Sequence, residues 1–167
     1  MEIREARPEE FDALGDITVA AYKSLEGGHL DPGYEAMLRA VADCAASAVV
    51  LVAIDAGELV GGVTYVPEPG PYAEFDGDDE AGVRMLAVDP YAQGKGAGTI
   101  LMRACIGRAE AERKARLVLH STPWMTSAHR IYDRLGFRRA PDRDWQPLPA
   151  VPLLGFVLDL GAAEVSP

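Results

Sequence analysis

Glycines alternate with other residues in the stretch of the sequence that most clearly suggests chemistry. The stretch comprises Gln93, Gly94, Lys95, Gly96, Ala97, Gly98 and Thr99. An apolar run suited to a buried strand precedes it, and an amphipathic helical pattern begins within it. A helix N-terminus leaves N–H groups unpaired and carries partial positive charge, and glycine lets the main chain approach a ligand closely. The stretch therefore predicts a site for phosphate oxygens, where Lys95 could add a positive charge.

The spacing of these glycines excludes two common nucleotide-binding motifs. No G-K-[ST] closes the stretch, as in a Walker loop, and glycines two residues apart do not form G-x-G-x-x-G. The stretch instead fits Q-x-x-G-x-G at Gln93, Gly96 and Gly98, and it follows the sequence L-A-V-D-P at residues 86–90. Taken alone, the stretch could also be an ordinary glycine-rich turn between a strand and a helix.

A second pattern lies about thirty residues beyond the glycines. Residues 128–137 fit A-x-x-[LI]-Y-x-x-[LF]-G-F, with Tyr132 at the aromatic position. The two motifs together resemble those of the GNAT superfamily of N-acetyltransferases, and they cover most of residues 80–137. The resemblance implies acetyl-CoA as co-substrate and no metal, with the amides of the glycine stretch holding the CoA pyrophosphate.

The resemblance also implies roles for the preceding strand and for the tyrosine. The main chain of Leu86, Ala87 and Val88 is expected to run along the pantetheine arm and to polarise the thioester carbonyl. Tyr132 is expected to protonate the departing thiolate, which is reasonable for a phenol of pKa about 10 beside a thiol of about 8.5. The alternative for Tyr132 is a core aromatic residue with its hydroxyl bonded to main chain.

The general base is where the sequence departs from the family pattern. Gly82 occupies the strand position at which family members often have a glutamate. Glu80 is two residues earlier on the same face of the strand, and His120 ends the next predicted strand. Both are candidates for the base, either could be a plain strand-end polar residue, and ordered water is a further alternative.

A second departure concerns a contact to the pantetheine. Met125 stands where the family often has an asparagine that bonds this arm, and Thr126 or Ser127 could supply the hydrogen bond instead. This leaves one CoA contact undetermined and does not affect the choice of cofactor.

Acidic residues gather in the predicted loop at residues 67–79. The acidic residues of the loop and its edge are Glu68, Glu74, Asp76, Asp78, Asp79 and Glu80, interleaved with Tyr72 and Phe75. One interpretation is a lid that attracts a cationic acceptor such as a polyamine, an aminoglycoside or a basic peptide N-terminus. The other is a solvated acidic loop.

Alternating helical and strand patterns predict the elements that must position these residues. In order, we expect a strand at 2–6, helices from Pro8 and from Asp31-Pro32, strands at 49–54 and 59–66, the strand from Glu80, the helix after the glycines, a strand at 116–120, a helix capped by Thr126 or Ser127, an irregular stretch at 141–152 and a strand at 153–160. The order predicts an α/β fold with a mixed, mostly antiparallel twisted sheet of about six to seven strands and helices on both faces. It also matches the GNAT order, with residues 1–167 as a single domain. The strand before the glycines and the strand at 116–120 are expected to be parallel neighbours.

Composition narrows the class of protein. The chain has 167 residues, 49% of them hydrophobic, and it shows no membrane-spanning run or signal-peptide pattern, so we expect a cytoplasmic protein. Cys44 and Cys105 lie in apolar helical stripes, which predicts buried thiols. The net charge of −10 argues against a nucleic-acid partner and favours cationic substrates.

The function expected from the resemblance is transfer of an acetyl group to a primary amine by direct attack in a ternary complex. The alternatives are a non-catalytic acyl-CoA sensor and a regulatory domain for another nucleotide. A homodimer through the last strands is common in the family. The acceptor, the acyl group and the oligomeric state are not determined by the sequence.

Overall fold

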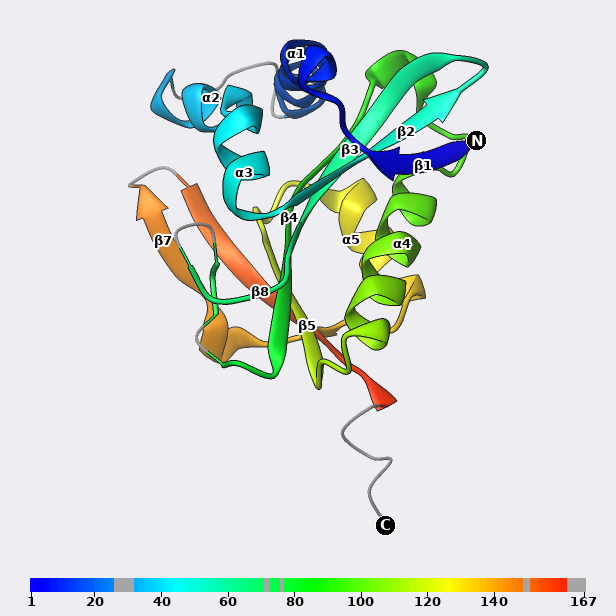
Figure 1. Cartoon of the computed structure of the whole chain (residues 1–167). Helices are drawn as coiled ribbons and strands as arrows, with labels where there is room; N and C mark the ends of the chain where they lie inside the picture. Colours follow the sequence, from blue (N-terminus) through cyan, green and yellow to red (C-terminus); the bar gives the residue numbers. More distant parts are fainter. Residues whose placement is uncertain (26–31, 71–72, 76, 149–150, 162–167) are drawn as a thin grey trace. The chain divides into compact units, whose positions relative to one another are not determined.

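The computed structural model describes residues 1–25, 32–70, 73–75, 77–148 and 151–161 (Figure 1). Its helices are α1 (Phe11–Lys23), α2 (Pro32–Arg39), α3 (Val41–Ser47), α4 (Ala97–Ala111) and α5 (Thr126–Arg134), with 3-10 turns η1 (Pro8–Glu10), η3 (Pro90–Ala92) and η4 (Pro141–Arg143). Its strands are β1 (Glu2–Glu5), β2 (Val49–Asp55), β3 (Glu58–Val66), β4 (Glu80–Val88), β5 (Arg116–Ser121), β6 (Arg138–Arg139), β7 (Trp145–Leu148) and β8 (Val151–Asp159). The predicted α/β class is therefore confirmed, with eight strands in place of six to seven.

The chain divides into two compact units. The first comprises Met1–Tyr65 and Met85–Ala104, and the second comprises Val66–Arg84 and Cys105–Pro167. Strand β4 and helix α4 each contribute residues to both units. The expectation of a single domain stays a prediction.

The first unit contains the strands in the order β1-β2-β3-β4. β1 falls within the strand predicted at 2–6 and pairs antiparallel with β2 at the edge of the sheet, and β2 pairs antiparallel with β3. The turn between β2 and β3 has positive φ at Ala56 (51°) and Gly57 (82°), which is the backbone twist that tight hairpins favour.

Adjacent glycines in β3 show that helices cover both faces of this sheet. A Cβ atom at Gly62 would lie 2.6 Å from Leu14 of α1, whereas one at Gly61 would lie 2.6 Å from the Ala87 carbonyl and 3.5 Å from Leu101 of α4. Because successive strand residues point to opposite faces, α1 and the start of α4 pack on opposite sides. The predicted arrangement of helices is thus confirmed in this unit.

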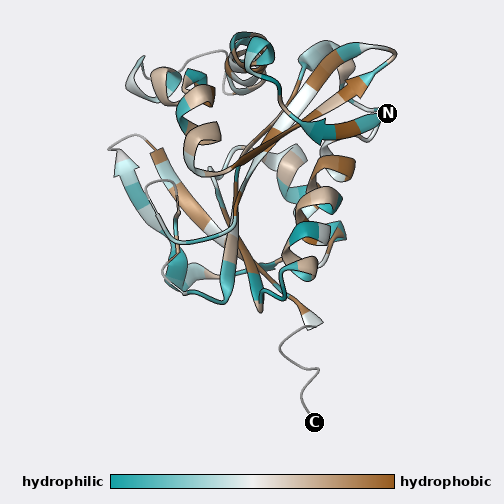
Figure 2. Ribbon diagram, in the orientation of Figure 1, coloured by the Kyte–Doolittle hydropathy of each residue, from teal (hydrophilic) through white to brown (hydrophobic). Residues whose placement is uncertain are grey.

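The second unit is built around β5. β4 pairs with β5 in parallel from Glu80 to Val83, as predicted for these neighbours. β5 pairs antiparallel with β8, which also pairs with β6 and β7. Apolar residues concentrate along β8 (Figure 2), and Leu117, Leu119 and Val157 are at most 2% exposed. Most strand pairs are therefore antiparallel.

Three local predictions were wrong. The helix expected from Asp31-Pro32 is interrupted at Ala40, although no glycine or proline marks the break. In the stretch at 141–152, the described residues 141–148 and 151–152 are not irregular, because they contain η4, β7 and the start of β8. The N-cap of α5 is Met125 and not Thr126 or Ser127, because Thr126 is already the first residue of the helix.

The predicted apolar stripe of α4 is also corrected in part. Ala97, Leu101 and Cys105 are buried as expected, but Ile100 is 37% exposed. Cys44 and Cys105 are both free and buried, in agreement with the prediction. Among the described residues, no helix combines the length and apolar character that a membrane crossing requires.

Candidate functional site

The glycine stretch forms a loop that leads directly into α4. Gly94 (φ 88°) and Gly96 (φ 85°) both adopt the left-handed backbone region that glycine enters without strain. The loop begins at Asp89, whose N–H donates to the Val60 carbonyl at 2.8 Å and whose carboxylate accepts from the Tyr91 N–H at 3.0 Å. These bonds fasten the start of the loop to β3 and to η3.

Helix α4 begins at the end of this loop. The Ile100 N–H donates to the Gly96 carbonyl at 3.0 Å, which places the first helical bond there. The N–H groups of Ala97, Gly98 and Thr99 therefore fall in the first turn, which has no intrahelical acceptors. The geometry has the features of an anion site at a helix N-terminus.

Side chains on the loop leave its main chain accessible. Gln93, Gly94, Lys95 and Gly96 are exposed, whereas Ala97 and Gly98 are buried and Thr99 is intermediate. The Lys95 ammonium lies 3.8 Å from the Asp55 carboxylate, and its side chain is 62% exposed. An exposed ion pair of this kind is weak, so the lysine is available to an anionic ligand.

The side chains at the end of β4 are buried or half-buried. Leu86 and Ala87 have buried side chains, with 8% and 3% exposed, and Val88 is half-buried. Met85 has a φ of 60°, which interrupts the regular strand just before them. Such an outlier in a non-glycine residue costs energy and is most common at functional sites.

Tyr132 lies in an aromatic cluster of the second unit. Its side chain is buried, and ring centroids of Phe156 and Phe137 lie 5.6 and 5.8 Å away. Burial raises the pKa of the Tyr132 phenol well above its ordinary value. The hydroxyl is therefore protonated at neutral pH, as a proton donor must be. The ring is also part of the core, which is one element of the alternative interpretation of Tyr132.

A serine–histidine pair beside Tyr132 was not predicted from the sequence. His129 Nε2 lies 3.1 Å from Ser121 Oγ, and the His129 ring is 6.2 Å from that of Tyr132. Burial lowers the pKa of His129, which keeps the ring neutral. His129 and Tyr132 are three residues apart on one helix, and this spacing could have predicted that the histidine lies beside the tyrosine.

At the position where the family often has an asparagine, Met125 lies in the core, and the next two residues lie on the surface. Met125 is buried, and its sulfur lies 3.5 Å from Ser121 Oγ. Thr126 and Ser127 are both exposed at the start of α5. The Ser127 contact to the cofactor stays a prediction.

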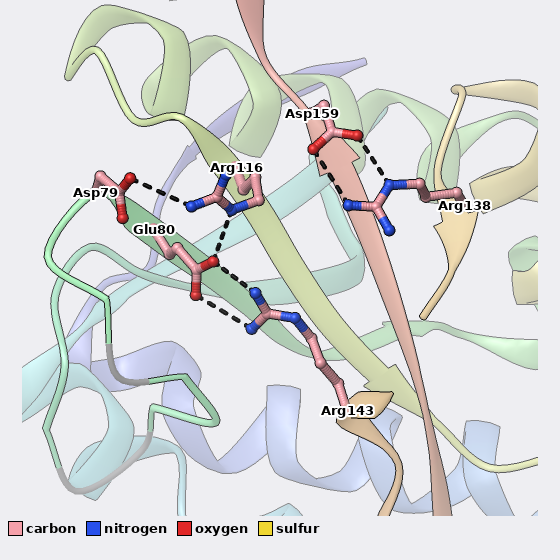
Figure 3. Close-up of polar contacts among 6 residues, drawn as sticks. All are labelled: Asp79, Glu80, Arg116, Arg138, Arg143 and Asp159. Carbon is pink, nitrogen blue, oxygen red and sulfur yellow. Dashed lines mark hydrogen bonds and ion pairs between the residues drawn. The ribbon is translucent and has the colours of Figure 1, made fainter. Parts of the chain in front are cut away.

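Glu80 is held by two arginines (Figure 3). Arg143 donates to it from both Nη atoms, at 3.1 and 2.6 Å, and Arg116 Nε donates at 2.7 Å. Burial alone would raise the pKa of Glu80, but the hydrogen bonds from Arg143 and Arg116 outweigh it and hold the pKa below its usual value. A carboxylate so engaged is a weak proton acceptor, so this geometry does not favour Glu80 as the base.

The strand position expected for a glutamate has no room for a side chain. A Cβ atom at Gly82 would lie only 2.7 Å from the ring of Phe75 and 3.6 Å from the Val118 carbonyl. Phe75 itself is 7% exposed. The ring of Phe75 therefore occupies the space that a residue-82 side chain would need.

His120 is nearly completely buried, with 2% of its side chain exposed. Its Nε2 lies 2.8 Å from the Arg143 carbonyl oxygen, and its Nδ1 lies 3.4 Å from a carboxylate oxygen of Glu74. The structure thus joins the second candidate base to a carboxylate that was expected only as part of an acidic lid.

Other acidic residues of this loop have structural contacts. Lys114 Nζ donates to the Asp78 carbonyl at 3.2 Å, and Arg116 contacts the Asp79 carboxylate at 3.2 Å. Glu68 is exposed, while Tyr72 and Asp76 lie outside the described residues. Within the described ranges, no group of three or more His, Cys, Asp or Glu side chains could hold a metal ion.

Comparison with known structures agrees with this architecture. A GNAT-family acetyltransferase from Staphylococcus aureus Mu50 superposes with a TM-score of 0.76 at 16% identity, covering 95% of this chain and 98% of that one. An N-acetyltransferase from Thermoplasma acidophilum in complex with coenzyme A gives a TM-score of 0.71 at 13% identity, covering 95% and 98%. A putative acetyltransferase from Salmonella typhimurium with acetyl-CoA gives 0.64 at 23% identity, covering 96% and 94%.

Sequence comparison identifies the family. N-acetylaspartate synthetase from Danio rerio is 30% identical over 100 residues, which are 60% of this chain and 33% of the relative, so the match spans about a third of that protein. The model of the Acetyltransferase (GNAT) family matches residues 12–137, well over half of the chain. With both motifs inside that range, the chain belongs to the GNAT acetyltransferase family.

Proposed function

We propose that this protein transfers an acetyl group from acetyl-CoA to a primary amine. The observation that carries the proposal is the glycine loop that opens α4, where Gly94 and Gly96 have positive φ and the first-turn N–H groups have no intrahelical acceptors. Solved relatives with coenzyme A and with acetyl-CoA support the same cofactor.

In this proposal the main chain supplies most of the cofactor contacts. The residues assigned to acetyl-CoA are Leu86, Ala87, Val88, Gln93, Gly94, Lys95, Gly96, Ala97, Gly98, Thr99 and Ser127. The loop amides receive the pyrophosphate, and Lys95 adds its charge. Main-chain N–H groups of β4 stabilise the negative charge that develops on the thioester oxygen.

Tyr132 is the proposed general acid. The amine nitrogen attacks the carbonyl carbon, the carbon–sulfur bond breaks, and the thiolate takes the proton of the phenol. The raised pKa keeps the phenol protonated until the carbon–sulfur bond breaks and negative charge develops on the sulfur.

His120 is the proposed base, in preference to Glu80. Glu80 already accepts three hydrogen bonds from Arg143 and Arg116, whereas one ring nitrogen of His120 makes no hydrogen bond within the described residues. An imidazole nitrogen that has a lone pair and no hydrogen-bond partner can take the proton that the attacking amine must lose.

The test is acetyl-CoA turnover, read as release of free thiol, over a panel of primary amines. The panel contains polyamines, aminoglycosides and basic peptides, with aspartate added because of the name of the zebrafish relative. Amine-dependent release with an acetylated product supports the proposal.

Two other results would favour an alternative function. Tight CoA binding with only slow, amine-independent hydrolysis would indicate an acyl-CoA sensor. Protection against melting by ADP or ATP equal to that by CoA would indicate a domain for another nucleotide.

A further inference from the structure

The environment of His120 contains an unsatisfied nitrogen. The side chain is 2% exposed, and within the described residues its Nδ1 has no hydrogen-bond partner. The carboxylate of Glu74 lies 3.4 Å from Nδ1, which is within reach of an ion pair, but the two atoms do not form a directed hydrogen bond. Buried polar atoms in native structures are nearly always paired, so this nitrogen calls for an explanation.

The other ring nitrogen determines which tautomer the neutral ring adopts. Nε2 lies 2.8 Å from the Arg143 carbonyl, and a carbonyl oxygen can only accept a hydrogen bond. Nε2 must therefore carry the hydrogen. In the neutral ring, Nδ1 then has a lone pair that faces the Glu74 carboxylate, so two acceptors lie together with no hydrogen between them.

We infer that Glu74 and His120 Nδ1 form the binding site for the ammonium group of the acceptor, an inference that rests on the proposed acetyltransferase function. A primary ammonium has three N–H donors and a positive charge, so it satisfies both acceptors at once. One of its protons then passes to Nδ1, the freed amine lone pair can attack, and the Glu74 carboxylate stabilises the resulting imidazolium. The substrate class is a primary amine that arrives protonated.

The surroundings assign this task to Glu74 and to no other described acid. Within the described residues, His120 contacts Glu74 and the Arg143 carbonyl, and the charge of Asp144 also acts on it. The Arg143 guanidinium is bound to Glu80, and the Asp144 carboxylate is bound by the Arg139 guanidinium at 2.7 Å.

Phe75 holds Glu74 in place. The Phe75 ring packs against Gly82 of β4. Because Glu74 and Phe75 are adjacent in the chain, the Glu74 carboxylate is anchored beside this strand. The side chain of Glu74 is 16% exposed, which leaves an approach for a charged group from solvent.

The test compares Glu74→Gln with Glu110→Gln, which changes an exposed acid on α4. Loss of a charge-assisted hydrogen bond should raise the KM for the amine by about tenfold or more, with the KM for acetyl-CoA unchanged. Glu74→Asp should recover part of the loss, and Glu110→Gln should behave as wild type.

A binding measurement keeps the inference separate from turnover. Ethylammonium chloride, titrated into protein labelled with nitrogen-15 in histidine, should shift the His120 ring signals in the wild type and not in Glu74→Gln. His120→Asn identifies these signals among those of the three histidines. If ammonium shifts His120 but no amine is acetylated, the site stands and the proposed function fails. If amines are acetylated and Glu74→Gln changes neither KM nor the spectrum, the site is overturned and the function stands.

Discussion

The glycine loop and the polar cluster at Glu80 and His120 reach their chemistry by different means. The loop presents main-chain N–H groups, which are positioned by glycines two residues apart and by the start of α4. The cluster works through side chains, and its contacts join residues as far apart as Glu80 and Arg143. A main-chain site tolerates changes of side chain but not of backbone conformation, whereas a side-chain site behaves in the opposite way.

Removal of one hydroxyl should have the largest effect. Tyr132→Phe keeps the ring in its contacts with Phe137 and Phe156 and removes the proposed proton donor. We expect kcat to fall by about a hundredfold, the usual size of a general-acid effect, in steady-state thiol release. Tyr91→Phe alters a tyrosine that is 98% exposed and should leave kcat unchanged. Equal activity of Tyr132→Phe and the wild type would assign the tyrosine to the core alone.

The Glu80 network should prove to be structural. Glu80→Gln leaves two arginines without their carboxylate and should lower the free energy of unfolding by about 2 kcal/mol, less than for a fully buried pair because both arginines are partly exposed. Asp159→Asn breaks the exposed pair with Arg138 and should cost less than about 1 kcal/mol. Denaturant titration measures both, and kcat should survive in each.

This network also gives a pH dependence of definite sign. The pKa of Glu80 is lowered in the folded state, so its stabilisation is present above the unfolded-state pKa of about 4.3 and is lost as pH falls through the lower folded-state pKa. The difference in unfolding free energy between wild type and Glu80→Gln should therefore be constant above about pH 5 and shrink below about pH 4. A constant difference down to the acid-unfolding range would contradict this account.

Steric exclusion at Gly82 can be tested by a compensating change. Gly82→Ala should cost about 1 to 2 kcal/mol because its Cβ meets the Phe75 ring. The same change in a Phe75→Ala background should cost much less, since the ring is gone. Gly107→Ala, where nothing lies within 4 Å of the added Cβ, should not destabilise the protein. Additive costs at Gly82 and Phe75 would mean that the ring is not the obstacle.

The smallest effect is expected in the loop. Gly96→Ala places a Cβ at a φ of 85° and should cost about 1 kcal/mol in stability. Gly57→Ala, at a φ of 82° with equally open space, should cost the same. Calorimetric titration should show acetyl-CoA binding weakened about fivefold only in Gly96→Ala, because the proposed cofactor site includes Gly96 and not Gly57. Equal binding by both variants would remove the loop from the cofactor site.

The same comparison explains which features could be predicted from the sequence. The loop, the parallel pairing of β4 with β5 and the position of Tyr132 depend on local patterns and on motifs with fixed spacing. Three other contacts depend on how the connecting segments pack in the folded chain. They are the hydrogen bonds from Arg143 to Glu80, the packing of the Phe75 ring against Gly82 and the contact of His120 with Glu74. No periodicity encodes such contacts, so they required the structure. The break at Ala40 likewise has no local signal.

The central claim, direct acetyl transfer to an amine, is tested most directly by the fate of a labelled acetyl group. Carbon-labelled acetyl-CoA is mixed with the enzyme and an accepted amine, and the label is followed in the amine, in free acetate and in the protein by intact mass. The account predicts one labelled acetyl group on the amine for each thiol released, with none on the protein. Label that accumulates on the protein, or that appears only as acetate, would contradict it.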